Sequence, residues 1–403
     1  MTGVLGILVF VVVAWLLSDA RRSVRWRTVL VAFGLQLGIG ALVFGVESGR
    51  EALAWLSARV SEVLGAGQAG IEFVFGPLGS DGGRIGFVFA ARVLPMIVFF
   101  SSLIAVLYHL GVMQWVIRLL GGALRKLLGT SRGESMSAAA NIFVGQTEAP
   151  LVVKPLIPGM TPSELFAVMV GGLATVAGSV MAGYAAMGVE MKYLLAASFM
   201  AAPGGLLFAK LMKPETARPH EELLPFATGD EAPANVLDAA ALGASTGLRL
   251  ALNVGAMLLA FIGLIAVLNL MLGGIGGWFG QDGWSLQGAL GAVFAPVAWL
   301  AGVAPEEIRQ GGSLIGQKLV LNEMVAYVEL TRMQEAMSAK TRAVCSVALC
   351  GFANFSSIAI LLGGLGGMAP GRRAEIARYG LKAVLAATLA NLTSAAIVGL
   401  FLE

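Results

Sequence analysis

Long runs of apolar, uncharged residues recur along the whole chain, and short segments that carry most of the charge separate them. A helix needs about 20 such residues to cross the hydrocarbon core of a bilayer. The pattern predicts eight spans, at 1–18, 28–46, 93–117, 165–189, 193–209, 250–281, 343–370 and 383–402. We therefore expect an all-α polytopic membrane protein.

Two further apolar regions, roughly 135–153 and 285–327, do not fit a continuous span. Each is interrupted by glycine, proline and a polar cluster with a carboxylate, GQTEAP in the first and LNEMVAY in the second. Broken backbone at membrane depth must be buried in protein or line a cavity. We predict that both regions are re-entrant hairpins.

Composition supports a lipid environment and excludes several functions. Of 403 residues 57% are hydrophobic and 13% are charged, whereas a soluble domain carries about 25% charged residues. The net charge of +3 gives no reason to expect a nucleic-acid partner. Two cysteines and two histidines make a disulfide framework or a histidine-based metal centre improbable, so no cofactor is expected.

Basic residues indicate the orientation, because lysine and arginine concentrate in cytoplasmic loops. In an eight-span arrangement the basic clusters all fall on one side, at 21–27, 118–132, 210–218 and 372–378. Both termini then lie outside, and residues 213–245 form a cytoplasmic connection. The weakly amphipathic stretch 47–86, around Trp55, Leu56 and Val60, is expected to lie in the outer interface.

The two predicted hairpins are followed by similar segments. Glu148 precedes a span interrupted at Thr175, and Glu323 precedes a span interrupted around Asn354. The chain crosses three times between the hairpins, so the second unit enters from the opposite face. Inverted repeats with interrupted helices are the signature of a secondary transporter whose substrate site lies near the midplane.

The polar residues of these regions also allow simpler interpretations. A carboxylate at membrane depth costs at least about 2.5 kcal/mol, which points to function unless it sits at a water-exposed hairpin end. Small polar side chains such as Asn322 and Ser357 could serve as contacts between helices. His109, expected near the centre of a span, could relay protons or bond to a neighbouring helix.

Four motifs in order make the chain resemble the concentrative nucleoside transporter family. They are Gly145 to Pro150 (GQTEAP), Gly178 to Tyr184 (GSVMAGY), Gly316 to Tyr327 (GQKLVLNEMVAY) and Cys350 to Ser357 (CGFANFSS). The resemblance extends from about residue 90 to the C-terminus. Met324 stands where this family usually has phenylalanine.

The resemblance implies eight spans plus two hairpins, a homotrimer, and an elevator-type transport domain that moves against a scaffold. It divides the chain into scaffold helices and an interfacial helix (1–92), a first repeat (93–212), the connection (213–245) and a second repeat (246–403).

Residue roles follow from the same resemblance. Gln146, Thr147 and Glu148 would read the nucleobase, with Val180 packed on the base. The ribose would be read by Glu323, Asn354 and Ser357, with Phe352 beside sugar and base. A carboxylate can accept from two vicinal hydroxyls, whereas asparagine and serine offer both donor and acceptor.

The resemblance also implies a sodium site built of oxygen ligands. They would be the Asn141 side chain, the Val144 carbonyl, the Thr175 hydroxyl and the Val176 carbonyl. Broken helices expose such carbonyls, and transporters use them to hold Na⁺.

The predicted function is import of nucleosides by symport with Na⁺ across the cytoplasmic (inner) membrane of a bacterium. One alternative is a proton-coupled nucleoside or nucleobase carrier, with Glu148 or His109 taking the proton. An intramembrane enzyme would need aspartate-rich motifs that bind metal and diphosphate, which the few aspartates do not form. A passive channel is the third alternative.

Overall fold

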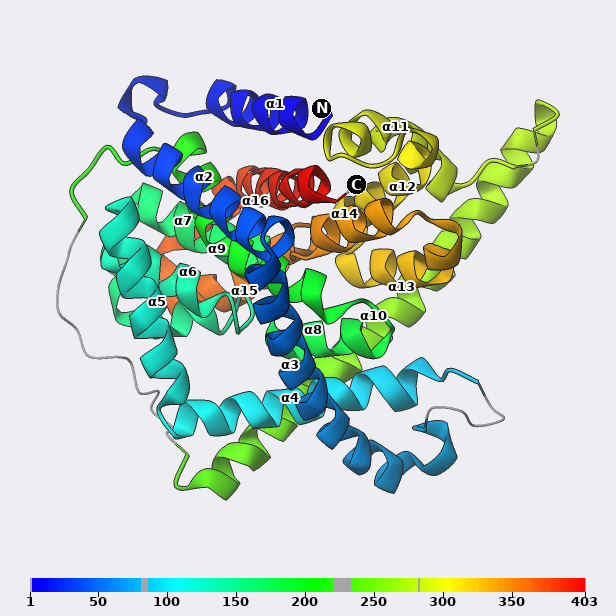
Figure 1. The fold of residues 1–403 in the computed structure, drawn as a ribbon, viewed down its shortest axis with the longest axis horizontal. Coiled ribbons are helices and arrows are strands. Elements are labelled where there is room, and N and C mark those ends of the chain that lie inside the picture. The colour runs from blue at the N-terminus through cyan, green and yellow to red at the C-terminus, as the bar shows by residue number, and fades with distance from the viewer. Residues whose placement is uncertain (1, 81–85, 220–232, 282, 403) are drawn as a thin grey trace.

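The computed structural model describes residues 2–80, 86–219, 233–281 and 283–402, and every regular element among them is helical. Gly3 lies against Ala396 and Leu400, so the first and last described helices are neighbours (Figure 1). Parts of two predicted segments, 81–85 and 220–232, fall outside the described residues. The predicted all-α class is confirmed.

The first part of the chain forms five helices. They are α1 (Thr2–Leu16), α2 (Trp26–Gly40, continued by a π turn to Gly45), α3 (Glu47–Phe75), α4 (Phe89–His109) and α5 (Val112–Leu128). Helix α3 confirms that the stretch around Trp55 is helical, while its position in the membrane interface stays a prediction.

The first hairpin and the helices after it make up the middle of the chain. They are α6 (Arg132–Ala140), a 3₁₀ segment η4 (Ala149–Gly159), α7 (Pro162–Ala174), α8 (Gly178–Ala186), α9 (Met191–Met212) and α10 (Val236–Trp278). Helix α6 and η4 run to and from a non-helical tip at 141–148, which confirms the predicted hairpin with somewhat wider limits.

The last part repeats the hairpin and the interrupted span, with one helix before them and one after them. It comprises α11 (Leu286–Leu300), α12 (Ile308–Val320), α13 (Glu323–Met333), α14 (Ala339–Leu349), α15 (Ser356–Met368) and α16 (Arg373–Phe401). Both predicted interruptions are present, since α7 and α8 are separated at 175–177 and α14 and α15 at 350–355.

Helices α9 and α16 form the centre of the molecule. Helix α9 packs against α2, α7 and α16, and α16 also packs against α1, α14 and α15 (Figure 1). Every residue in the most apolar stretch of Pro162–Ala186 is buried, compared with 22% for Phe89–His109 and 11% for Val236–Trp278. The interrupted span thus lies inside protein, where broken backbone is tolerated.

Helices α4 and α10 cross closely because small residues face each other at the crossing. A Cβ atom on Gly243 would lie 2.6 Å from the Ala105 Cβ, and one on Gly247 would lie 2.8 Å from the Val98 Cα. The Ser102 hydroxyl donates to the Ala240 carbonyl at 2.9 Å. Glycines spaced by four residues allow this approach in membrane helices.

Two predicted boundaries and the place of one residue were wrong. The run 93–117 is not one helix, because the chain turns at Gly111 (φ +79°) between α4 and α5. His109 is therefore the exposed last residue of α4 and not the centre of a span. The connection 213–245 ends earlier than predicted, since α10 begins at Val236.

The second hairpin also has different limits from the predicted 285–327. Helix α11 is a separate element that ends before a left-handed turn at Gly302 (φ +93°), and the hairpin consists of α12 and α13. Pro305, Glu306 and Glu307 lie between α11 and α12, so the sequence carried a usable signal for this boundary.

Six helices in the described residues are long and apolar enough to cross a membrane: Trp26–Gly45, Phe89–His109, Pro162–Ala186, Met191–Met212, Val236–Trp278 and Pro370–Phe401. The other two predicted spans are the shorter α1 and the divided pair α14 and α15. The count of eight stays a prediction.

Candidate transport site

The tip of the first hairpin lies against the interruption between α7 and α8. The Phe143 carbonyl in the tip accepts a hydrogen bond from the Gly178 amide at 2.9 Å. A Cβ on residue 178 would lie 2.8 Å from that carbonyl oxygen, so glycine is required there. The tip and the interruption therefore form one site.

The backbone at this interruption leaves the helical conformation. Thr175 is extended (φ −116°, ψ 171°) directly after α7, and α8 starts three residues later. The Thr175 hydroxyl donates to the Gly171 carbonyl at 3.0 Å, which leaves its lone pairs available. Carbonyl groups of an unwound segment lack the helical partners that would otherwise occupy them.

Two buried oxygens beside the tip have no hydrogen-bond partner among the described residues. They are the Asn141 Oδ1 and the Ser137 Oγ, one helical turn apart at the end of α6. The Asn141 amide nitrogen donates to the Ser137 carbonyl at 2.9 Å, so the side-chain oxygen of Asn141 is the atom left without a partner. Buried unpaired oxygens are costly unless a ligand satisfies them, and hard oxygens of this kind fit the predicted Na⁺ site.

Glu323 is held at the tip of the second hairpin as the first residue of α13. Asn322 caps this helix, since its side-chain oxygen accepts from the Val325 amide at 2.9 Å. The Glu323 carboxylate accepts from the Tyr184 hydroxyl at 3.1 Å and from the Asn354 amide at 3.0 Å. Both donors are neutral, so the buried carboxylate keeps acceptor capacity for further hydroxyl groups.

Asn354 and Ser357 connect this carboxylate to the first hairpin. The Asn354 side-chain oxygen accepts from the Ser356 hydroxyl at 2.7 Å and from the Ser357 amide at 2.9 Å, both in the first turn of α15. The Ser357 hydroxyl in turn accepts from the Gln146 amide at 3.4 Å. Residues 211 positions apart in the sequence thus meet between the two hairpins.

The predicted base-reading residues surround the first tip. The Gln146 Oε1 is buried without a partner among the described residues, which leaves an acceptor available. The Glu148 carboxylate accepts from the Gly145 amide at 2.7 Å, and Thr147 packs where a Cβ on Gly364 would not fit. Val180 is buried in α8.

Phe352 joins the two interruptions through its backbone. Its amide donates to the Thr175 carbonyl at 3.1 Å, and its side chain is half-buried. The structure thus links Gln146 with Ser357, and Glu323 with Asn354. Three predicted site residues have a place in the structure but no contact that tests their role. Val144 lies in the first tip, Val176 in the interruption and Val180 in α8.

Sequence reasoning missed two polar groups of this region, Tyr184 and Ser137. The Tyr184 ring lies against the Tyr327 ring with centroids 4.2 Å apart, and its hydroxyl donates to Glu323. A tyrosine at membrane depth needs a partner for its hydroxyl, so the last residue of the GSVMAGY motif carried a usable signal.

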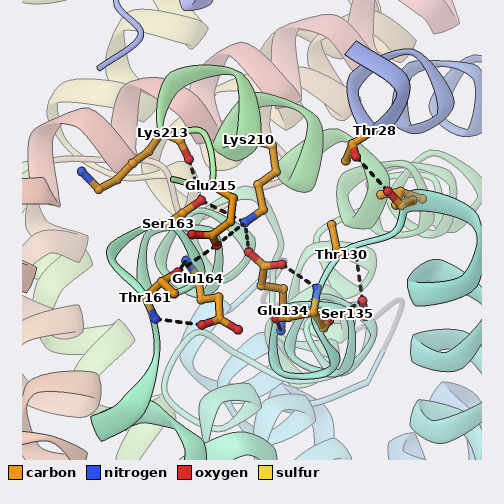
Figure 2. Close-up of polar contacts among 12 residues, drawn as sticks. Thr28, Thr130, Glu134, Ser135, Thr161, Ser163, Glu164, Lys210, Lys213 and Glu215 are labelled. Atoms are coloured by element: carbon orange, nitrogen blue, oxygen red, sulfur yellow. Dashed lines mark hydrogen bonds and ion pairs between the residues drawn. The ribbon is translucent and has the colours of Figure 1, made fainter. Parts of the chain in front are cut away.

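A second polar cluster, the Lys210 cluster, joins the starts of α6 and α7 to the end of α9 (Figure 2). The Lys210 ammonium pairs with Glu134, donates to the Ser163 hydroxyl at 2.9 Å and lies 3.6 Å from the Glu215 carboxylate. Glu134 and Glu164 each close a capping box, with Ser131 and Thr161 respectively. These contacts hold the first hairpin, α7 and α9 as one unit.

A cavity of about 30 Å³ lies beside the Lys210 cluster, lined among others by Arg25 and Thr28. This volume has room for one or two water molecules, whereas small-molecule sites measure some hundreds of Å³. The contacts of the cluster join helices to one another, which is a structural role.

Comparison with known families matches three consecutive segments. A model described as the C-terminus of a Na⁺-dependent nucleoside transporter matches residues 193–399, and its N-terminal counterpart matches 5–78. A gate model described as nucleoside recognition matches 90–191. The fold and this assignment define a secondary transporter, and the chain belongs to the Na⁺-dependent (concentrative) nucleoside transporter family.

Similar proteins come from bacteria and mammals. Nucleoside permease NupC of Helicobacter pylori is 48% identical over 99% of this chain and 97% of its own length. Sodium/nucleoside cotransporter 1 of Mus musculus is 40% identical over 98% of this chain and 63% of its own length.

Solved structures of CNTnw share this fold. Its inward-facing, substrate-bound structure has 56% identity and a TM-score of 0.95, and covers 99% of this chain and 97% of the other. An outward-facing variant gives a TM-score of 0.97 and covers 99% and 98%. The family consists of transporters that use sodium as the coupling ion, so an intramembrane enzyme is excluded.

Proposed function

We propose that this protein imports nucleosides by symport with Na⁺. The observation that carries the proposal is the convergence of both hairpin tips on both interrupted spans, through the Gln146–Ser357 and Glu323–Asn354 hydrogen bonds. Such a site at the repeat interface is where secondary transporters bind their substrates.

In this proposal the ribose binds to the second repeat. The Glu323 carboxylate accepts from the ribose hydroxyls, while Asn354 and Ser357 orient it and Phe352 lies beside the sugar. Charge-assisted hydrogen bonds of this kind are strong in a closed site. Support comes from the carboxylate's two neutral donors, which position it without neutralising it.

The base binds to the first repeat, where Gln146, Thr147 and Glu148 read its edge and Val180 packs on its face. The unpartnered Gln146 Oε1 supports this assignment, because a nucleobase amine or imide would satisfy it.

Sodium binds beside the base site, at the Asn141 and Thr175 side chains and the Val144 and Val176 carbonyls. The unpartnered Asn141 Oδ1 supports this site, and Ser137 adds a further candidate oxygen. Binding of the ion fixes the tip that carries Gln146, which would couple ion and nucleoside.

At the level of the assembly, we propose a homotrimer in the inner membrane of a bacterium, with both termini outside. A transport domain within the repeats 93–212 and 246–403 would move as an elevator against a scaffold, which includes residues 1–92 and the first span of the second repeat. The Lys210 cluster supports a rigid moving unit, because it ties the first hairpin to α7 and α9.

The test is uptake of radiolabelled uridine and adenosine into proteoliposomes of the purified protein. An inward sodium gradient at constant pH should drive accumulation, and an equal potassium gradient should not. A carrier driven by a proton gradient alone would instead be the proton-coupled alternative, and equilibration without accumulation would indicate a channel.

A further inference from the structure

A lysine is buried where the two interrupted spans approach each other. Lys318, in the last turn of α12, is 3% exposed, and its ammonium donates to the Ala348 carbonyl at 2.8 Å and to the Asn391 Oδ1 at 2.7 Å. The Asn391 amide donates to the Ala174 carbonyl at 2.7 Å and the Cys350 carbonyl at 3.1 Å. The Lys318 ammonium and the Asn391 amide thus donate hydrogen bonds to carbonyl groups at the ends of both α7 and α14.

The approach of the two interruptions is very close. A Cβ on Gly351 would lie 2.4 Å from the Asn391 Oδ1 and 2.9 Å from the Ala174 carbonyl oxygen. Residue 351 must therefore be glycine for the two spans to meet around Asn391.

The hydrogen-bond acceptors of Lys318 are neutral oxygens, and the Glu323 carboxylate is the negative charge that acts on it electrostatically. Among the described residues no carboxylate forms an ion pair with it, and both of its hydrogen-bond acceptors are neutral. The C-terminal ends of α7 and α14 carry partial negative charge, which favours a cation there. Neutral carbonyl and amide oxygens at the end of an interrupted helix are the kind of shell that holds Na⁺ in transporters.

The two repeats differ near the end of the first helix of each hairpin. Lys318 lies three residues before Leu321, the residue that caps the end of α12. Three residues before Asn141, which caps the end of α6, the first repeat has Ala138. The first repeat thus leaves oxygens such as the Asn141 Oδ1 unpartnered, whereas the second repeat supplies an ammonium of its own.

We propose that Lys318 is a resident cation that occupies, in the second repeat, the place that a coupling ion takes in the first. Lys318 is a positioning residue, since it acts by holding the two interruptions together around Asn391. A second coupling ion is excluded there because the ammonium already satisfies the oxygens. The parallel with the first repeat rests on the sodium site proposed above.

The experiment compares two substitutions that differ in the space they leave. Lys318→Ala removes the charge and leaves room beside the Ala348 carbonyl and the Asn391 side chain. Lys318→Met removes the charge and fills most of that room with apolar atoms. Gln317→Ala is the matched control, because the neighbouring Gln317 is equally buried and donates to Ser313 of its own helix.

Uridine uptake is measured against sodium concentration, and the melting temperature of each purified variant is measured in sodium, lithium and choline. The sodium dependence of Lys318→Ala should become steeper, with a Hill coefficient that rises from about 1 towards 2, since a second ion replaces the ammonium. Sodium should also raise its melting temperature by more than it does for Lys318→Met, the wild type or Gln317→Ala.

The inference is overturned if Lys318→Ala and Lys318→Met respond to sodium equally in melting temperature, whatever their uptake. The melting comparison is independent of transport, so it holds even if both variants lose uptake. Absence of sodium-driven uptake in the wild type would instead contradict the proposed function, and the two failures are thereby distinguished.

Discussion

At the scale of single residues, Glu323 gives the most specific prediction. Its buried carboxylate accepts hydrogen bonds from two neutral donors and can accept further hydrogen bonds from a substrate. Removing one partner of a buried, charged hydrogen bond costs about 2–5 kcal/mol. Glu323→Gln should therefore weaken uridine binding by more than tenfold, as measured by calorimetry or scintillation proximity.

The same variant should also lose discrimination between ribose and dideoxyribose. In the wild type, dideoxyuridine leaves the Glu323 carboxylate without its hydroxyl partners, a penalty that Glu323→Gln no longer suffers. The affinity gap between uridine and dideoxyuridine should shrink in this variant and stay wide in Gln146→Ala, which alters base preference. Full ribose discrimination in Glu323→Gln would make the ribose assignment wrong.

The proposed sodium oxygens give a second prediction at this scale. Thr175→Val and Asn141→Leu each remove one side-chain oxygen at about constant volume. Each should raise the sodium concentration for half-maximal uptake by about fivefold or more, since one such interaction contributes about 1 kcal/mol. Unchanged sodium dependence in both variants would place the coupling ion elsewhere. Thr246→Val, an exposed position on α10, is the matched control.

At the scale of elements, the crossing of α4 and α10 depends on glycines that face the partner backbone. Gly247→Val places a side chain against the Val98 Cα, and overpacking of this kind costs about 1–3 kcal/mol. The variant should melt at a lower temperature than the wild type. Gly263→Val on the same helix has open space around its Cβ and should not. Equal melting of the two variants would show that the crossing contributes little.

At the scale of the whole molecule, orientation follows from the basic clusters of the loops. If the clusters around 21–27 and 372–378 are cytoplasmic, a reporter active only in the cytoplasm and fused after Glu403 should be silent. The same reporter inserted at Pro214, between α9 and α10, is the positive control. Activity of the C-terminal fusion with a silent fusion at Pro214 would overturn the orientation, and activity of both fusions would overturn the even number of spans.

The sequence by itself determined the class, the family and most of the residues that meet at the site. A long apolar run predicts a helix that is buried in the membrane or in protein. A carboxylate inside such a run indicates function, because burying its charge is costly. Glu148, Glu323 and the two interruptions could be found for this reason. The glycines at 111 and 302 can also be read from the sequence, but a glycine by itself does not predict a left-handed turn.

Only the tertiary structure decided which partner each polar group takes and which helices are buried in protein. Hydropathy measures transfer out of water, and it does not distinguish lipid from protein as the destination. It therefore could not tell the buried α7 from the largely exposed α10. The pairing of Gln146 with Ser357, and of Lys318 with Asn391, depends on packing between distant segments, which local patterns do not encode.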